Sequence, residues 1–533
     1  MGSLTLSFAH FYHQETKYSP ENLKQQSASL DWESQPYPFK EYKSNHKQID
    51  LSPYLPLSTN PFSNIALKKS NCWTDEEKPL AELSRLLYFA NGITAIVPYP
   101  PNPLLMRAAP SAGGLYPNEL YIVSSDYHPE LGNGLFNYQV KTHSLCQLID
   151  GKSPYNSIQK ACFNHPAVEE TDLIIIISGI FERSAWRYGD RAYRRVLLDA
   201  GHIWGNIELI AYLFGRKAYC LGGFNDHYLN DSLMFENEYS LMVIALPKIN
   251  KSQSQNINLL DNPIALASSI QQQTAYIPKG KRINALHHFS EINQNVTESK
   301  VKLIDKILKE YSDEPQDANF QCFLESEKLD FTPIEWEKCS LMTTILKRRS
   351  ARKFDSDMQI TKKQLGQILQ FAYNPNIYKG ISFDEKPLTF VPELLKTHLI
   401  INNVEGLDSG CYLYEWEGQS IKQIRFKELK DEAHYLCLGQ EMGRDASVLI
   451  FHTCDLAKAV NIYGERVYRY LHLDAGFIGQ KINLAAIKLG LGASGIGGFF
   501  DDIANESLGI AESNIVLYIT ALGVPVEQAE EIF

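Results

Sequence analysis

The segment RRSARKF has the residue types that bind a phosphate or another small anion. Arg348, Arg349 and Arg352 could each donate two parallel hydrogen bonds to an oxyanion, and the hydroxyl of Ser350 could donate a further one. A helix is expected shortly afterwards, because Thr361 stands where a side-chain oxygen can cap a first turn. The competing interpretation of so short a motif is a solvated basic segment.

A second segment, RAAPSAGGLYPNELYIV, places small residues between two prolines and leads into a strand pattern. Small side chains let the backbone approach a flat ligand closely. Pro110, Ser111, Ala112 and Gly113 are therefore candidates for a binding loop. The alternative is a plain turn before a strand.

Two other patterns look like a dinucleotide-binding motif and a metal site, but their sequence context argues against both. The sequence GxGxxG at 490–495 follows a helix pattern and precedes a strand pattern, the reverse of the order in a dinucleotide-binding fold. The histidines His10 and His13, and the pair His287 and His288, lie in polar stretches. Solvated histidines are the expectation there, and no metal site is predicted.

A stretch of 37 residues occurs twice in the chain. YGDRAYRRVLLDAGHIWGNIELIAYLFGRKAYCLGGF starts at Tyr188, and YGERVYRYLHLDAGFIGQKINLAAIKLGLGASGIGGF starts at Tyr463, so the offset is 275 residues without a gap. Of the 37 positions 18 are identical, where chance would give roughly two or three. The chain is therefore a duplicated domain.

The elements that must position these motifs also recur. In both copies an apolar strand pattern leads through a polar turn into a long helix, then a glycine turn and a second strand pattern. The helix LDAGFIGQKINLAAIKLG is apolar around most of its circumference, so it should be buried, and the contact between the copies would bury it. Gly215 and Gly490 stand where a glycine ends a helix. The predicted fold class is α+β, with a sheet sandwiched by helices.

Composition divides the rest of the chain. Residues 1–60 have no duplicated counterpart and are predicted to form an extended arm, followed by the first copy at 61–248. Residues 249–335 are predicted to be a linker, because their first part is rich in Asn, Gln and Ser. A short helix is expected at 301–311 within this linker. The second copy is predicted at 336–533.

Charge and cysteine usage exclude several classes of protein. The net charge is −11, without a long basic block, which argues against a nucleic-acid partner. The longest apolar run, LIIIISGIF at 173–181, is too short to span a bilayer, and the N-terminus does not have the pattern of a signal peptide. Nine scattered cysteines without a CxxC pair suit a reducing compartment. A cytoplasmic protein without a membrane partner is expected.

Together PSAGGLYP, RRSARKF, YGxRxYR and the GGF turn resemble the nitroreductase-like FMN oxidoreductases. The chain is most similar to the SagB-type dehydrogenases, a branch that includes azoline oxidases of peptide natural-product pathways. The resemblance implies a central, mostly antiparallel sheet flanked by helices. It also implies a two-fold dimer with FMN at the interface, which the two copies would form here within one chain, as a pseudo-dimer.

The resemblance also assigns roles to residues. The second copy would hold the FMN phosphate through Arg348, Arg349, Ser350 and Arg352, and the backbone of Gly497 and Gly498 would lie near the flavin N5. The proline–serine loop would come from the first copy, through Pro110, Ser111, Ala112 and Gly113.

The opposite interface would combine Lys68, Ser70, Gly222 and Gly223 with the loop PLTFVP from Pro387, which has lost the Ser-Ala-Gly-Gly element. Each half is degenerate where the other is intact. One FMN site per chain is therefore expected, with a vestigial or repurposed second site.

Catalytic residues are less clearly marked. Azoline oxidases of this family carry a Lys-Tyr pair where this chain has Arg187 and Tyr188. Arginine stays protonated and is a poor base, whereas Tyr188 could act as an acid or base if Arg187 lowered its pKa. A structural role is the alternative, since the tyrosine recurs at Tyr463.

Acidic residues of the repeat are expected to have internal partners. Asp199 and Asp474 lie inside the buried helices, where hydrogen bonds or ion pairs to the repeated arginines are predicted. Asp501 and Asp502 are expected to cap the turn after GGFF rather than to bind a metal. The arginines concerned are Arg191, Arg194, Arg466 and Arg469.

Two functions remain open from the sequence. The first is an FMN-dependent oxidoreductase that acts on a small molecule or a modified peptide, with NAD(P)H as a candidate electron donor. The second is a non-catalytic flavin-fold partner protein of a biosynthetic complex. Conservation of both specific elements at one interface favours catalysis.

Overall fold

The computed structural model describes residues 7–25, 30–42, 46–55, 74, 76–98, 103–248, 262–272, 276–293, 327–329, 332–336, 338–373 and 389–526. The predicted α+β class is confirmed, because each copy is built around an antiparallel sheet flanked by helices. The first sheet has the order β1-β6-β5-β4-β7-β9-β8, and the second has the order β10-β15-β14-β12-β16-β18-β17. The same topology in both sheets is what a duplicated sequence should give.

The strands of the two copies correspond to one another in order. Those of the first sheet are β1 (Gln48–Asp50), β4 (Asn118–Ser124), β5 (Gly134–Gln139), β6 (Ser144–Asp150), β7 (Leu173–Gly179), β8 (Tyr219–Leu221) and β9 (Tyr239–Ala245). Those of the second are β10 (Glu327–Lys328), β12 (Lys396–Ile401), β14 (Gly410–Glu415), β15 (Ser420–Phe426), β16 (Val448–Asp455), β17 (Gly492–Ile496) and β18 (Asn514–Gly523). The edge strands β1 and β10 come from the two segments that the repeat does not include.

The helices that matter for the site flank these sheets. They are α1 (Phe8–Glu15), α3 (Lys78–Asn91), α6 (Phe181–Tyr188), α7 (Ala192–Leu213), α8 (Asp226–Ser232), α9 (Arg282–Phe289), α11 (Lys338–Lys347), α12 (Lys362–Tyr373), α15 (Leu456–Tyr463), α16 (Val467–Lys488) and α17 (Asp501–Leu508). Thr361 and Gln364 exchange hydrogen bonds ahead of α12, so the predicted cap is confirmed. Gly215 and Gly490 follow α7 and α16 with positive φ, as expected for terminal glycines.

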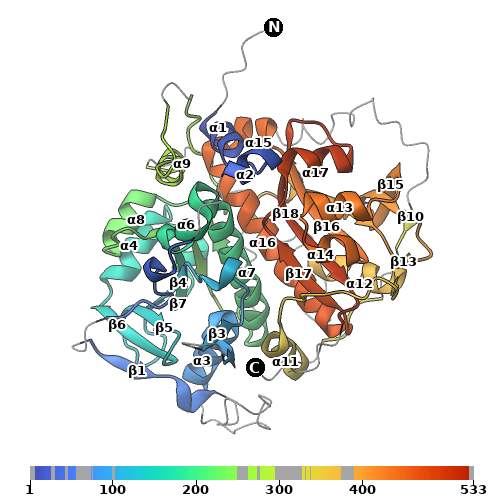
Figure 1. Cartoon of the computed structure of the whole chain (residues 1–533). Helices are drawn as coiled ribbons and strands as arrows, with labels where there is room; N and C mark the ends of the chain where they lie inside the picture. The colour runs from blue at the N-terminus through green and yellow to red at the C-terminus, as the bar shows by residue number, and fades with distance from the viewer. Residues whose placement is uncertain are drawn as a thin grey trace.

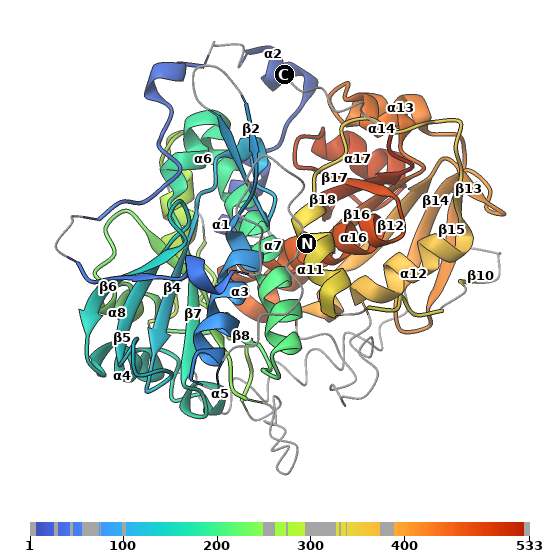
Figure 2. The ribbon, with the colours of Figure 1, turned by 90° about the horizontal axis from the view of Figure 1, so that it is seen from below.

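The repeated helices α7 and α16 pack against each other and join the two copies, with one sheet on either side (Figures 1 and 2). Gly201 and Gly476, equivalent positions of the repeat, lie where the helices touch. A Cβ added at Gly201 would be 2.2 Å from the carbonyl oxygen of Leu473, and one at Gly476 would be 2.2 Å from that of Leu198. The helices can approach this closely only because both positions are glycine.

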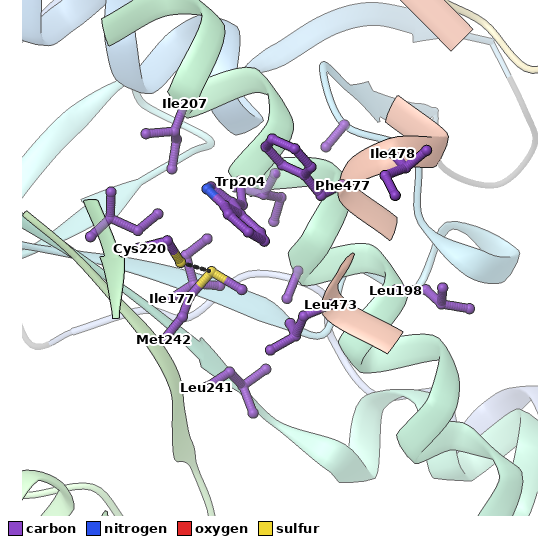
Figure 3. Close-up of a cluster of buried hydrophobic side chains, with 14 of the residues drawn as sticks. Ile177, Leu198, Trp204, Ile207, Cys220, Leu241, Met242, Leu473, Phe477 and Ile478 are labelled. Carbon is purple, nitrogen blue, oxygen red and sulfur yellow. Dashed lines mark hydrogen bonds between the residues drawn. The ribbon is translucent and has the colours of Figure 1, made fainter. Parts of the chain in front are cut away.

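Apolar packing surrounds this contact (Figure 3). The ring of Trp204 on α7 lies 4.1 Å from that of Phe477 on α16, centroid to centroid. Behind them, Ile177 and Met242 belong to the first sheet. The two copies therefore share one core, and the predicted intrachain pseudo-dimer is confirmed.

The N-terminal segment is not simply extended, as the sequence analysis predicted. Ser7 caps α1 through the backbone N–H of His10, and the carboxylate of Glu465 accepts hydrogen bonds from the backbone N–H groups of Phe8 and Ala9. Those N–H groups belong to the open first turn of α1, so a partner about 450 residues away stabilises this helix. The short helix expected at 301–311 lies outside the described residues.

Candidate functional site

The arginines of RRSARKF reach from the second copy to the first, after the end of α11. The Arg348 guanidinium donates from Nε to the carbonyl oxygen of Ala108 (2.7 Å) and from Nη2 to that of Arg107 (3.1 Å). Arg349 donates from Nη2 to the carbonyl oxygen of Thr94 (2.9 Å). The contact brings the basic segment next to the proline–serine loop across the interface between the copies.

Asp199 of α7 holds the proline–serine loop in place. Its carboxylate accepts from the hydroxyl of Ser111 (2.6 Å) and from the backbone N–H of Ala112 (3.2 Å). Burial raises the pKa of Asp199 to about 7, although the hydrogen bonds from Ser111 and Ala112 act in the opposite direction. Gly113 has φ +65°, a conformation that favours glycine.

Tyr188 at the end of α6 lies against this loop. A Cβ added at Gly113 would be 2.7 Å from the Tyr188 hydroxyl oxygen and 3.4 Å from Cδ of Arg187. Arg187 acts to lower the pKa of Tyr188, which is the condition that the sequence analysis set for an acid–base role, but the net shift is upward. Burial raises the pKa, and the opposing effects of Arg195 and Arg187 are smaller. Tyr188 therefore stays protonated at neutral pH.

Arg195 completes the interface and was not recognised from the sequence. Its guanidinium lies 3.8 Å from the centre of the Tyr188 ring, as a cation–π contact. A Cβ added at Gly497 would be 2.6 Å from Nη1 of Arg195, and one at Gly498 would be 3.8 Å from Nη2. Arg195 thus connects the tyrosine of the first copy to the glycine turn of the second.

The composite interface, defined here by Arg348, Arg349, Ser111–Gly113, Tyr188, Arg195 and the turn Gly497–Gly498, brings together most of the predicted residues. No salt bridge joins Arg195, Arg348 or Arg349 to a carboxylate of the described residues, and Nε of Arg195 is buried without a partner there. Burial, and then the neighbouring Arg349, lower the pKa of Arg348 to about 10.

Cations without a carboxylate partner in the described part of the chain, beside a loop and a turn of small residues, would suit a planar molecule that carries an anionic group, such as FMN. The other two predicted phosphate ligands, Ser350 and Arg352, have exposed side chains that make no hydrogen bond involving the described residues.

The opposite interface is filled by side chains. A Cβ added at Gly222 would be 2.5 Å from the Tyr470 ring and 2.7 Å from the Phe390 ring, and one at Gly223 would be 2.4 Å from Leu266. Tyr470 is the repeat equivalent of Arg195, and Phe390 belongs to PLTFVP. The carboxylate beside this loop is also equivalent in the two copies. Asp474, the repeat counterpart of Asp199, accepts a hydrogen bond from the backbone N–H of Phe390 (2.9 Å).

The predicted linker supplies part of this filling. The backbone N–H groups of Gly222 and Gly223 both donate to the carbonyl oxygen of Ile264. The Tyr470 hydroxyl donates to the carbonyl oxygen of Leu266 (2.9 Å). Lys68 and Ser70, the predicted anion ligands of this interface, lie outside the described residues, as do the first two residues of PLTFVP.

Asp199 and Asp474 accept internal hydrogen bonds as predicted, but the predicted ion pairs of these carboxylates with the repeated arginines are wrong. Arg191 and Arg194 of the first copy bind Asp501 of the second, at 2.7 and 2.8 Å. The reciprocal pairs join Arg466 and Arg469 to Asp226, at 2.5 and 2.7 Å. Asp501 therefore receives arginines rather than capping a turn.

Two of the four histidines predicted to be solvated are buried, whereas His288 is exposed as predicted. His13 and His287 are each 1% exposed, and burial holds the pKa of both well below the usual range. Among the described residues, no group of three or more His, Cys, Asp or Glu side chains has the arrangement of a metal site. In that same part of the chain, every helix is too short or too polar to cross a membrane.

The duplicated α+β fold is that of a known class of oxidoreductases. A model described as the nitroreductase family matches residues 73–246 and again residues 345–524. The chain therefore belongs to the nitroreductase family, and the predicted tandem duplication is confirmed.

Individual relatives agree with this assignment. The crystal structure of a protein described as a nitroreductase from Anabaena variabilis is 42% identical, with a TM-score of 0.86, and the match covers 98% of this chain and all of that one. The trifolitoxin-processing protein TfxB of Rhizobium leguminosarum is 29% identical over 37% of this chain and 54% of its own length. The microcin B17-processing protein McbC of Escherichia coli is 27% identical over 23% of this chain and 46% of its own.

Three residues at the interfaces were missed from the sequence, although a signal existed for two of them. Arg195 and Tyr470 occupy the same position of an otherwise similar motif, YGDRAYRR and YGERVYRY. A difference at that position marks where the two interfaces diverge. Leu266 carried no such signal, because it belongs to a polar stretch without a duplicated counterpart.

Proposed function

We propose that this chain is an FMN-dependent oxidoreductase of the SagB type, with one FMN at the composite interface. The observation that carries the proposal is the difference between the two interfaces. One brings Arg348, Arg349 and Arg195, none of which has a carboxylate partner among the described residues, to a loop and a turn of small residues. At the other, Phe390, Tyr470 and the linker occupy the corresponding space.

The chain's own residues have distinct parts in this proposal. Arg348 and Arg349 would hold the phosphate, while Ser111–Gly113 and the turn Gly497–Gly498 would lie against the flavin ring. When bound, FMN would accept or donate a hydride at N5. Asp199 orients the loop through Ser111 and Ala112. Tyr188, protonated at neutral pH because burial raises its pKa, could donate a proton but not accept one.

The proposed substrate is a small molecule or a modified peptide. The names of TfxB and McbC, which process a toxin and a microcin, support a peptide. Arg187 at the position of the lysine seen in azoline oxidases argues against azoline oxidation, because arginine does not act as a base at neutral pH. NAD(P)H is proposed as the electron donor for a reductive reaction, and a cytoplasmic location remains the expectation.

Flavin content tests the proposal directly. The full chain is purified, its visible spectrum is recorded and released FMN is measured per chain, with Arg348→Ala and the exposed-arginine control Arg444→Ala beside it. We expect one FMN per chain in the wild type and in Arg444→Ala. Arg348→Ala should bind FMN about tenfold or more weakly, because a charge-assisted hydrogen-bond donor is lost.

Other outcomes would contradict this proposal in different ways. Two FMN per chain would mean that the opposite interface opens to the cofactor. No FMN, even after addition, would favour the non-catalytic partner protein. Gly497→Val, which fills the turn without removing a charge, should also lose FMN and shows whether the turn lies at the flavin. Bleaching of bound FMN by NADPH or NADH alone would identify the donor.

A further inference from the structure

The N-terminal segment has a structural counterpart in the second copy, which its sequence does not reveal. Residues 7–18 correspond to residues 281–292, which belong to the predicted linker, but only His13 and His287 are identical between the two stretches. Each stretch forms a helix of eight residues, α1 in the first and α9 in the second. The correspondence therefore rests on contacts rather than on sequence.

Equivalent arginines of the repeat hold the ends of these two helices in the same way. Thr16 directly follows α1, and its hydroxyl oxygen accepts from Nη2 of Arg194 (2.7 Å). Ser290 directly follows α9, and its hydroxyl oxygen accepts from Nε of Arg469 (2.7 Å). The two helices thus occupy matching places in the pseudo-dimer.

The match continues for two more residues and makes Tyr18 the counterpart of Ile292. The backbone N–H of Tyr18 donates to Oδ2 of Asp501 (2.9 Å). The backbone N–H of Ile292 donates to Oδ2 of Asp226, also at 2.9 Å. In each copy the backbone N–H of the same aspartate donates back to the carbonyl oxygen. Since the backbones are held alike, a difference between the two side chains is a difference between the two interfaces.

The side chain of Tyr18 extends from this anchored backbone to the composite interface. Its hydroxyl oxygen lies 3.5 Å from Nη2 of Arg195, at the long end of hydrogen-bond distances. Its ring is held from another side by the guanidinium of Arg191, 4.2 Å from the ring centre. Arg195 itself lies on the ring of Tyr188 and beside the turn Gly497–Gly498. Tyr18 therefore brings the N-terminal segment into contact with this interface.

The opposite interface lacks both members of this contact. Tyr470 stands in place of Arg195, and its hydroxyl donates to the carbonyl oxygen of Leu266. Ile292 stands in place of Tyr18, is 3% exposed and has no hydroxyl. Of the two interfaces in the described part of the chain, the composite interface alone joins a tyrosine hydroxyl to a guanidinium group.

We propose that Tyr18 is a positioning residue of the composite interface, whose hydroxyl holds the Arg195 guanidinium against the Tyr188 ring and the glycine turn. A long side chain keeps one orientation only where contacts offset the lost rotamer entropy. Arg195 has no carboxylate partner among the described residues, so the tyrosine hydroxyl and ring provide those contacts. The inference rests on the proposed function, because the flavin ring would lie at that turn.

A fluorine label on Tyr188 tests the positioning of Arg195 without flavin. The full chain carries 3-fluorotyrosine at position 188, and its fluorine NMR signal is recorded with the native Tyr18 and Arg195, with Tyr18→Phe, with Arg195→Gln and with both substitutions. We expect each single substitution to shift the signal in the same direction, because each takes the guanidinium away from the ring. Tyr18→Phe should cause no further shift once Arg195 is replaced.

The exposed Tyr37 supplies a matched control from the same N-terminal segment. Tyr37→Phe also removes one tyrosine hydroxyl, but it should leave the fluorine signal unchanged. The inference fails if Tyr18→Phe leaves the signal unchanged. It also fails if Tyr18→Phe shifts the signal equally with and without Arg195, since Tyr18 would then not act through the guanidinium.

FMN titration of the unlabelled proteins connects this contact to the proposed function. Tyr18→Phe should raise the dissociation constant of FMN by about two- to tenfold, the range of one hydrogen bond. Tyr37→Phe should keep the wild-type value, and equal values for all three proteins would overturn the inference. A wild type that binds no FMN would overturn the proposed function, and the fluorine signals then show separately whether Tyr18 holds Arg195.

Discussion

At the scale of single residues, the buried carboxyl of Asp199 makes the stability of the folded chain depend on pH. One of its oxygens, Oδ2, lies within hydrogen-bond distance of both donors of the loop, Ser111 Oγ and Ala112 N. The pKa of Asp199 is raised by burial to about 7, above the usual value of 3.8. The folded chain therefore binds this proton more tightly than the unfolded chain does. This contribution stabilises the folded state at low pH and is lost as the pH rises through about 7.

Asp199→Asn should remove that pH dependence, because an amide oxygen can accept from the same two donors without ionising. We expect the melting temperature of the variant, relative to the wild type, to rise by about a few degrees between pH 5 and pH 8. Differential scanning fluorimetry at fixed flavin content measures it. Asp126→Asn, at an exposed ion pair with Lys152, is the control. A constant difference between the two proteins at all pH values would show that Asp199 titrates normally.

At the scale of elements, the crossing of α7 and α16 depends on Gly201 and Gly476. Gly476→Ala places a methyl group 2.2 Å from the carbonyl oxygen of Leu198, so the helices must move apart. We expect a loss of about 1–3 kcal/mol in the free energy of unfolding, as in overpacked cores. Gly418→Ala is the control, because its added Cβ meets only Ser420 Oγ, at 3.4 Å. Urea unfolding compares the two, and equal midpoints would mean that the crossing adjusts without cost.

Elements were predictable where the repeat or a local pattern specified them. The duplication gave both sheets and the two central helices, and Thr361 marked the start of α12. By contrast, α1 depends on Glu465, and the position of Leu266 depends on Tyr470 and Gly223. Two of these contacts, Glu465 with Phe8 and Leu266 with Tyr470, join segments more than 200 residues apart. A local pattern contains no information about such partners.

At the scale of the whole molecule, the two copies are joined by reciprocal buried ion pairs. The repeat shows that Asp226 and Asp501 are equivalent, as are Arg191 and Arg466. The repeat does not show that each arginine binds the aspartate of the other copy. Pairing within one copy and pairing between the copies would both be compatible with the same repeated sequence. The sequence analysis chose Asp199 and Asp474 instead, because they recur in the same repeated segment as the arginines. The exchange also ties in the flanking segments, because Asp501 accepts from the backbone N–H of Tyr18.

Asp501 and its neighbour Asp502 allow a matched test of these ion pairs. Burial would raise the pKa of Asp501, but Arg191 and Arg194 hold it below the usual range, so the carboxylate is charged at neutral pH. Asp501→Asn leaves two buried arginines without a counter-ion and should lower the free energy of unfolding by about 3–5 kcal/mol.

Asp502→Asn removes a pair with Lys17 in which the side chain of Asp502 is 70% exposed, and it should cost about 1 kcal/mol or less. Urea unfolding at pH 7 measures both variants. Equal losses would show that contact between α7 and α16, rather than exchanged charges, holds the two copies together. A large loss for Asp501→Asn alone would instead show that the ion pairs hold the two copies together. The composite interface would then depend on them, since Arg191 and Arg194 lie on the same stretch of chain as Arg195 and Asp199.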